Sequence, residues 1–454
     1  MRGTAFFSLI LFVGQYCSFY SFRFNHVLYL SAAKTMDQKK SLSTNVLNMA
    51  VIIAALGYFV DIYDLLLFGI VRRPSLIALG YTEDKQLLDI GAYLLNCQMA
   101  GMLIGGILWG ILGDKRGRLS VLFGSIILYS VANILNGTVN TLEMYAFYRF
   151  LAGVGLAGEL GAGITLVAEV MTKERRGYGT TIVAAFGIFG AVVGGLVAKL
   201  FDWRMAYYIG GGLGIALLIL RISAYESGMF HQLKRETVAR GNFLSLFTHR
   251  KRFSKYVKGI LIGIPIWFVI GILITFGPEY AQALGIGIDP ATGKTIVTGA
   301  NTIMYHYAGA ASGALFCGML SQYLQSRKKA LLYFLIADTI CVFAFVSLSG
   351  ISVPMFYFFS FLFGIANGYW SVFMTVASEA FGTNIRATVT TTTPNFVRGA
   401  VVPMTSVFLW VEGYSGSIIT AALSVGIVVL LLAFVALWRT TETYGKDLDY
   451  IENS

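Results

Sequence analysis

Charged residues are scarce in this chain. Asp, Glu, Lys and Arg make up 13% of its 454 residues, whereas 56% of the residues are hydrophobic. A soluble globular domain carries roughly 25% charged residues. Such a domain could not bury this surplus of apolar side chains. The composition therefore excludes an ordinary soluble domain and indicates a chain that lies in a membrane.

Cysteine and histidine are also few, with four residues of each. The cysteines stand singly in apolar surroundings, so their spacing predicts neither a disulfide framework nor a metal site. The sequence also shows no nucleophile–base spacing and no phosphate-binding loop. We therefore expect no enzymatic activity, no metal and no cofactor.

The net charge of +11 comes from basic residues in short loops between apolar runs. They form no patch with interleaved aromatic residues, so we expect no nucleic-acid partner. Loops rich in Lys and Arg are instead typical of the cytoplasmic side of membrane proteins. The predicted inner loops hold eighteen of these residues and the predicted outer loops hold six. Both termini are therefore predicted to be cytoplasmic, in a plasma membrane or a bacterial inner membrane.

Apolar runs of about 20 residues dominate the chain, and each could cross a hydrocarbon core of roughly 30 Å as a helix. Six runs lie at about 46–71, 89–112, 119–137, 141–170, 178–200 and 205–224, and six more at about 255–280, 298–324, 329–349, 353–379, 386–410 and 417–438. We predict an all-α membrane protein with twelve transmembrane helices in two six-helix bundles. The bundles would span 46–224 and 255–438, with a leader and tail at 1–45, a linker at 225–254 and a tail at 439–454.

The two halves resemble each other in sequence. Glu169 ends the fourth run and Arg176 follows seven residues later, while Glu379 and Arg386 have the same arrangement at the tenth run. The offset of 210 residues also pairs Gly158 with Gly368. Duplicated halves around a site at the bilayer midplane are the architecture of secondary transporters.

A glycine-rich, basic turn joins the second and third runs, reading Gly110-Ile-Leu-Gly-Asp114-Lys115-Arg116-Gly117-Arg118. It resembles the signature loop of the major facilitator superfamily. Three further stretches are similar to that family's proton-coupled members, its sugar porters and its metabolite:proton symporters: residues 149–155, 225–227 and 442–446. The glutamine-rich sugar motif is absent from residues 264–269, which argues against a hexose as substrate.

Ionisable residues inside the spans are candidates for function, because each costs about 2.5–3.5 kcal/mol at the bilayer centre. Asp61 and Asp64 share one face of the first span, and Arg149 and Glu159 lie in the fourth. The resemblance implies that a first-span Asp pairs with the fourth-span Arg and releases it on protonation. We expect Asp64 and Arg149 to form this coupling pair, with Asp61 or Glu159 in support. The alternative is a static ion pair that positions two helices.

Arg398 lies in the eleventh span, four residues after Pro394, which can bend the helix. Its guanidinium suits a carboxylate or phosphate, so we expect it to anchor an anionic substrate. The alternative is a hydrogen bond to a carbonyl, Glu379 or Glu412. The other polar residues that could line the cavity are Asn96, Gln98, His306, Asn367, Tyr369 and Trp370.

A second group of charges lies where the spans meet the cytoplasm. In the resembling family, such clusters hold the inner ends of the two halves together when the cavity opens outward. The resemblance therefore implies gating contacts among Asp114, Arg118, Glu169, Arg176, Glu379 and Arg386.

Together these features predict a monomeric secondary transporter whose halves rock around a central site. Its partners would be a small-molecule substrate, protons and the lipid bilayer. We expect symport of a small organic anion or related polar metabolite with protons. The alternative is a proton-independent uniporter or exchanger of a neutral solute such as a sugar or polyol. A membrane sensor that transports nothing fits less well, because the sequence shows no added soluble domain.

Overall fold

The computed structural model describes residues 49–116, 118–159, 176–226 and 245–446. Within these ranges the regular elements are helices, and the one isolated β-bridge pairs Ile288 with Thr295. The prediction of an all-α fold is confirmed.

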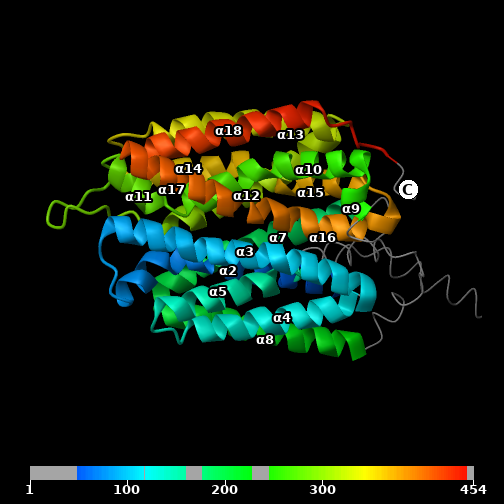
Figure 1. Ribbon diagram of the computed structural model, residues 1–454, viewed down its shortest axis with the longest axis horizontal. Coiled ribbons are helices and arrows are strands. Elements are labelled where there is room, and N and C mark those ends of the chain that lie inside the picture. Colours follow the sequence, from blue (N-terminus) through cyan, green and yellow to red (C-terminus); the bar gives the residue numbers. More distant parts are fainter. Residues whose placement is uncertain (1–48, 117, 160–175, 227–244, 447–454) are drawn as a thin grey trace, which may run out of the picture.

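The helices of the N-terminal half lie together on one side of the molecule (Figure 1). They are α2 (Met49–Ala78), α3 (Asp84–Arg116), α4 (Arg118–Asn136), α5 (Leu142–Leu156), α7 (Arg176–Leu200) and α8 (Trp203–Glu226). Thr141 starts α5 by accepting a hydrogen bond from the backbone N–H of Met144, which satisfies a donor that the first turn leaves free.

The helices of the C-terminal half occupy the other side (Figure 1). They are α9 (Ser245–Thr248), α10 (Arg250–Phe268), the π-helix η2 (Val269–Ile274), α11 (Gly277–Ala283), α12 (Gly299–Tyr323), α13 (Arg327–Val346), α14 (Val353–Asn367), α15 (Trp370–Glu379), α16 (Thr383–Gly399), α17 (Val401–Ser415) and α18 (Ile418–Trp438). Three predicted spans are interrupted here. The seventh comprises α10, η2 and α11, the tenth breaks at Gly368 and Tyr369, and the eleventh breaks at Ala400 rather than at Pro394.

Eight helical stretches among the described residues are long and apolar enough to cross a membrane. The interruption at Ala400 divides the eleventh predicted span into α16 and α17, of 17 and 15 residues, against the roughly 20 that a span needs. The described part of the fourth span is short as well, because α5 ends at Leu156. The count of twelve spans and the exact bundle boundaries stay predictions.

The two halves meet mainly along two pairs of helices, with smaller contacts of α2 with α12 and of α3 with α17. The N-terminal helices α3 and α7 contact the C-terminal helices α16 and α12, respectively. The 79–83 turn and the 284–298 loop lie at one end of the molecule, which the charge bias of the loops predicts to be outside. We call it the predicted outer end, and the end that carries α9 and the start of α16 the predicted inner end (Figure 1).

Glycines let the second and fourth spans of each half approach each other closely. A Cβ atom added at Gly153 of α5 would overlap the carbonyl oxygen of Gln98 in α3. One added at Gly364 of α14 would overlap the carbonyl oxygen of His306 in α12. Backbones in such contact are typical of membrane helix packing. The same helix pair therefore uses the same packing device in both halves, in line with the sequence repeat.

We expect Gly364→Ala to destabilise the protein by about 1–3 kcal/mol, because overpacking forces the backbones of α12 and α14 apart. Thermal unfolding of the purified protein measures the effect. Gly212 of α8 is the matched control, since an added Cβ atom there meets no atom within 4 Å. Equal melting temperatures for the Gly364→Ala and Gly212→Ala variants would contradict the assigned contact.

Candidate functional site

Asp61 and Asp64 point from α2 into the interior of the protein. Both side chains are fully buried, and none of their four carboxylate oxygens makes a hydrogen bond of good geometry with a described residue. Asp64 lies against Gly210 of α8, whose missing side chain leaves room for the carboxylate. Buried polar groups in proteins are normally hydrogen-bonded, so two bare carboxylates on one helix face are candidates for function.

Arg149 of α5 lies in the same buried region as Asp64. Its Nη2 donates to the side-chain oxygen of Gln98, and its Cζ lies 4.8 Å from the centre of the Phe68 ring. Nε and Nη1 have no hydrogen-bond partner among the described residues. The Arg149 charge acts on Asp64 electrostatically, but neither Asp64 oxygen makes a hydrogen bond to the guanidinium. The structure thus brings the predicted pair together without a direct bond.

Glu159, expected in support of the coupling pair, has a partner of its own. It forms a buried ion pair with Arg221 of α8, whose Nη1 lies 2.9 Å from Oε2 of the glutamate. The pair lies directly against Gly57 of α2. Sequence reasoning missed Arg221, although a lone arginine in the apolar run 205–224 was a visible signal.

Arg398 of α16 is 1% exposed and lies between two tryptophan rings. Its Cζ is 5.5 Å from the centre of Trp267 and 5.6 Å from that of Trp370. Nε and Nη1 have no hydrogen-bond partner in the described part of the chain. The Arg398 charge acts on Asp61 across the interface between the halves, and also on Tyr58 and Tyr307.

The two glutamates considered as partners of Arg398 are bound elsewhere. Glu379 pairs with Arg327 at 3.2 Å, and Glu412 pairs with Lys85 at 2.5 Å. The guanidinium of Arg398 therefore has donors available, and among the described carboxylates Asp61 is in its electrostatic range.

The remaining predicted cavity residues divide into separate groups. Trp370 belongs with Arg398, and Gln98 with Arg149. Asn96 accepts a hydrogen bond from Thr405 at 2.5 Å, where α3 meets α17. The Tyr369 hydroxyl donates to the carbonyl oxygen of Ile262 at 3.5 Å. Asn367 and His306 lie in the interior of the C-terminal half, apart from this group.

At the predicted inner end, Glu379 pairs with Arg327 and accepts a hydrogen bond from Thr443 at 2.8 Å. The Arg386 guanidinium donates to the backbone carbonyls of Ser378 and Phe381. Four predicted gating residues lie outside the part that can be described: Glu169 entirely, and Asp114, Arg118 and Arg176 in their side chains. Their gating role stays a prediction.

Glu442 caps the start of α13 from the segment after α18. Burial alone would raise the pKa of its carboxyl. Hydrogen bonds from the Ser326 hydroxyl and the backbone N–H groups of Tyr444, Arg327 and Thr443 lower that pKa from 4.5 to about 2 instead. The folded state therefore favours the ionised carboxylate.

This stabilisation is present above pH about 4.5 and is lost as the pH falls toward 2. We expect Glu442→Gln to lower the melting temperature at neutral pH, with a difference from the wild type that shrinks below pH 4.5. Melting curves of the wild type and the variant, recorded from neutral pH to below pH 4.5, measure this difference in melting temperature. A difference that stays constant with pH would show that the charge of Glu442 is not involved.

A buried charge cluster that the sequence did not reveal joins the halves at the predicted outer end. Nη2 of Arg72 in α2 lies 2.7 Å from each carboxylate oxygen of Glu279 in α11, and Arg73 Nη1 lies 3.1 Å from Glu279. Arg72 also lies over the Phe276 ring, with its Cζ 4.6 Å from the centre. Both arginines were expected in an outer loop, but α2 continues to Ala78. Glu279 pairs with both of them, and Asp84 pairs with Arg73. We call Arg72, Arg73 and Glu279 the outer latch.

Glu279→Gln is expected to separate the halves at the predicted outer end, because removing one partner of a buried ion pair costs about 3–5 kcal/mol. Pulsed electron paramagnetic resonance between spin labels at Thr82 and Thr292 would report a larger population at long distance. Asp89→Asn is the control, since the Lys85–Asp89 pair is exposed and within one helix. Unchanged distances in Glu279→Gln would exclude the latch.

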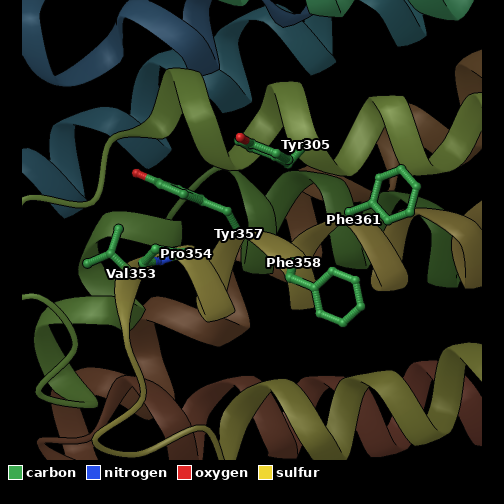
Figure 2. A pocket seen from close by; sticks show the side chains of 6 residues that line it. All are labelled: Tyr305, Val353, Pro354, Tyr357, Phe358 and Phe361. Atoms are coloured by element: carbon green, nitrogen blue, oxygen red, sulfur yellow. The ribbon is translucent and has the colours of Figure 1, made fainter.

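A hollow of about 300 Å³ lies on the surface of the C-terminal half between α12 and α14 (Figure 2). Its lining consists of Tyr305, Val353, Pro354, Tyr357, Phe358 and Phe361. The rings of Tyr305 and Tyr357 stack with their centres 5.3 Å apart. Tyr305 and Phe358 are largely exposed, and the lining contains none of the buried charges described above. The hollow is therefore not the candidate site.

Comparison with known proteins identifies the family. The family model described as "Major Facilitator Superfamily" matches residues 44–400. A Haemophilus influenzae protein named for metabolite transport is 28% identical over 88% of this chain and 97% of its own length. The sialic acid transporter NanX of Escherichia coli is 26% identical over 66% of this chain and 71% of its own.

Similarity to a solved structure agrees with this family assignment. The crystallised proton:xylose symporter XylE matches with a TM-score of 0.64 and 16% identity, over 88% of this chain and 97% of its own. The predicted family resemblance, the multi-pass membrane fold and the absence of an enzymatic role are confirmed by the family. The chain therefore belongs to the Major Facilitator Superfamily of membrane transporters.

Proposed function

We propose that the chain carries a small organic anion across the membrane together with protons. The observation that carries this proposal is Arg398, a buried guanidinium between Trp267 and Trp370 with donor atoms not engaged by the described residues. A buried cation needs a negative partner. The planar fork of arginine donors matches a carboxylate or phosphate.

The position of Asp61 supports a mechanism in which the substrate anion replaces Asp61 as the negative partner of Arg398. Asp61 lies across the interface between the halves and is the buried carboxylate whose charge Arg398 affects. A substrate carboxylate could replace it beside the guanidinium if Asp61 took up a proton. Binding of anion and proton would then favour each other, because two negative charges at one arginine repel.

The second step of the proposal concerns Asp64. A carboxylate near an arginine favours ionisation, and one in an apolar setting favours the protonated form. Asp64 lies in electrostatic range of Arg149 without a direct bond. A small movement of α2 relative to α5 could therefore load or release its proton. Glu159 would have a structural part, because its ion pair with Arg221 ties the segment just after α5 to α8.

Transport would follow by rocking of residues 46–224 against 255–438 around this charged centre. The outer latch supports a state closed at the predicted outer end. We also propose that the protein works as a monomer in the plasma membrane, or a bacterial inner membrane, with both termini cytoplasmic. The excess of basic residues in the predicted inner loops supports this orientation.

The aromatic rings around Arg398 support a second candidate function, the transport of a neutral sugar or polyol without protons. Trp267, Trp370 and Tyr58 could pack against a sugar ring. We favour the anion, since the donors of Arg398 that the described residues leave unused suit a carboxylate or phosphate. The sialic acid transporter among the relatives is named for an acid, which supports the same choice.

A thermal-shift screen of the purified protein distinguishes the transport of an anion from that of a neutral solute. The panel consists of small carboxylates, phosphate and neutral sugars and polyols. We expect stabilisation by one or more anions and by no neutral compound, because a ligand that binds the native state raises its melting temperature. Stabilisation by neutral compounds alone would overturn the proposal.

A further inference from the structure

The interior of the C-terminal half contains a second group of buried polar side chains. Asp338 of α13, Asn367 at the end of α14 and His306 of α12 are 0%, 2% and 0% exposed. None of them takes part in the contacts of Arg398 or Arg149 described above. Polar side chains at this depth are costly and are by default candidates for function.

The hydrogen bonds within this group are incomplete. Nδ2 of Asn367 donates to Oδ1 of Asp338 at 3.2 Å. Oδ2 of Asp338 and Oδ1 of Asn367 have no partner among the described residues. The imidazole of His306 faces the Asn367 amide and the backbone of Ser360, although neither ring nitrogen makes a hydrogen bond of good geometry. Asn367 therefore lies between a carboxyl group and an imidazole.

No cation balances Asp338 in the part of the chain that is described. Cys341 of its own helix and Tyr369 beyond the end of α14 are in its electrostatic range. His306 of α12 faces Asn367, and Cys317 of α12 lies near Tyr369. Helix α18, which also packs on α13, has no ionisable residue. An isolated ionised carboxylate is strongly disfavoured in such surroundings. Uptake of a proton removes this charge.

Asn367 also marks the point where the tenth span breaks. Helix α14 ends there, and α15 begins at Trp370 after Gly368 and Tyr369. A Cβ atom at Gly368 would overlap the backbone of Gly313 in α12. The break is thus packed on the helix that carries His306. A change in the hydrogen bond between Asp338 and Asn367 would act directly on this interruption.

We propose that Asp338 is a second proton-binding site of this transporter, in the C-terminal half, and that Asn367 couples its proton to His306. The carboxylate takes up one proton to form the neutral acid. The hydroxyl of this acid can donate a hydrogen bond to an acceptor such as Asn367 Oδ1, which has no partner among the described residues. The role of this proton in transport rests on the proton coupling proposed above. That Asp338 binds a proton does not depend on that coupling.

Infrared spectroscopy of the full-length protein in lipid nanodiscs, without substrate, tests the site. We expect a protonated-carboxyl C=O band at neutral pH that is lost in Asp338→Asn and retained in Asp202→Asn, a control at an exposed residue. In Asp338→Glu the band should persist at a shifted frequency, which keeps the test valid if the Asn variant does not fold. Identical bands in the wild type and Asp338→Asn would overturn the proposal.

A separate measurement tests the coupling between the Asp338 proton and His306. His306→Gln should shift the pH at which the band titrates by about one unit or more, as for interacting sites. An unchanged midpoint would overturn this part of the proposal. Proteoliposomes with an internal pH dye then measure protons moved per substrate, which should fall in Asp338→Asn while substrate still moves. An unchanged ratio beside a lost infrared band would overturn the role in transport but not the protonation.

Discussion

Asp64→Asn is expected to abolish accumulation of substrate driven by a pH gradient while leaving part of the exchange of substrate across the membrane. Asn has the shape of the protonated acid but cannot release a proton. The variant would therefore bind and reorient as the loaded form does, without coupling to the gradient. Uptake into proteoliposomes with and without an inward proton gradient, and counterflow of labelled substrate, measure the two activities.

Two further variants sharpen this prediction. Asp202→Asn should leave both activities unchanged, because this residue is exposed and its carboxylate accepts a hydrogen bond from the N–H of Met205 in its own helical turn. Asp61→Asn tests which of the two aspartates couples the proton. If gradient-driven uptake survives in Asp64→Asn and is lost in Asp61→Asn, then Asp61 has the role assigned to Asp64. Survival in both variants would exclude coupling through α2.

Arg398→Ala is expected to weaken binding of an anionic substrate by about 30-fold or more. Truncating one partner of a buried, hydrogen-bonded charge pair costs about 2–5 kcal/mol. Arg398→Lys should restore only part of the affinity, because an ammonium group lacks the planar fork of donors. Isothermal titration calorimetry with the anion found by the thermal-shift screen gives the Kd of each variant.

Arg204 offers a matched control for this experiment. It also lies over a tryptophan, with its Cζ 4.3 Å from the centre of the Trp203 ring, but its contacts are to Gly137 and Asn140 at the predicted outer end. Arg204→Ala should leave the Kd unchanged. A retained Kd in Arg398→Ala would dismiss Arg398 as the anchor and favour the neutral solute.

The sequence predicted the class of fold because hydrophobic run length is a local property. The helices α2 and α18, for example, occupy the first and last predicted runs. The boundaries were less accurate where distant residues intervene. Helix α2 continues past Arg72 and Arg73, which pair with Glu279, more than 200 residues later; Arg73 also pairs with Asp84.

The candidate site was predictable only in part. Buried charges are rare enough to recognise singly, which singled out Asp61, Asp64 and Arg398. Their partners come from other helices, and spacing along one chain does not reveal which helices meet. The sequence therefore assigned Asn367 and His306 to the substrate cavity, whereas Asn367 bonds Asp338 and His306 faces Asn367. The predicted roles of these residues in binding substrate remain untested.

Proton movement on addition of substrate tests the central claim most directly. The protein is reconstituted into proteoliposomes that contain a pH-sensitive dye, and the anion found by the thermal-shift screen is added outside without an imposed gradient. Coupled transport predicts acidification of the lumen in step with uptake, and neither signal in Arg398→Ala. Uptake of substrate with no change of internal pH would contradict proton symport.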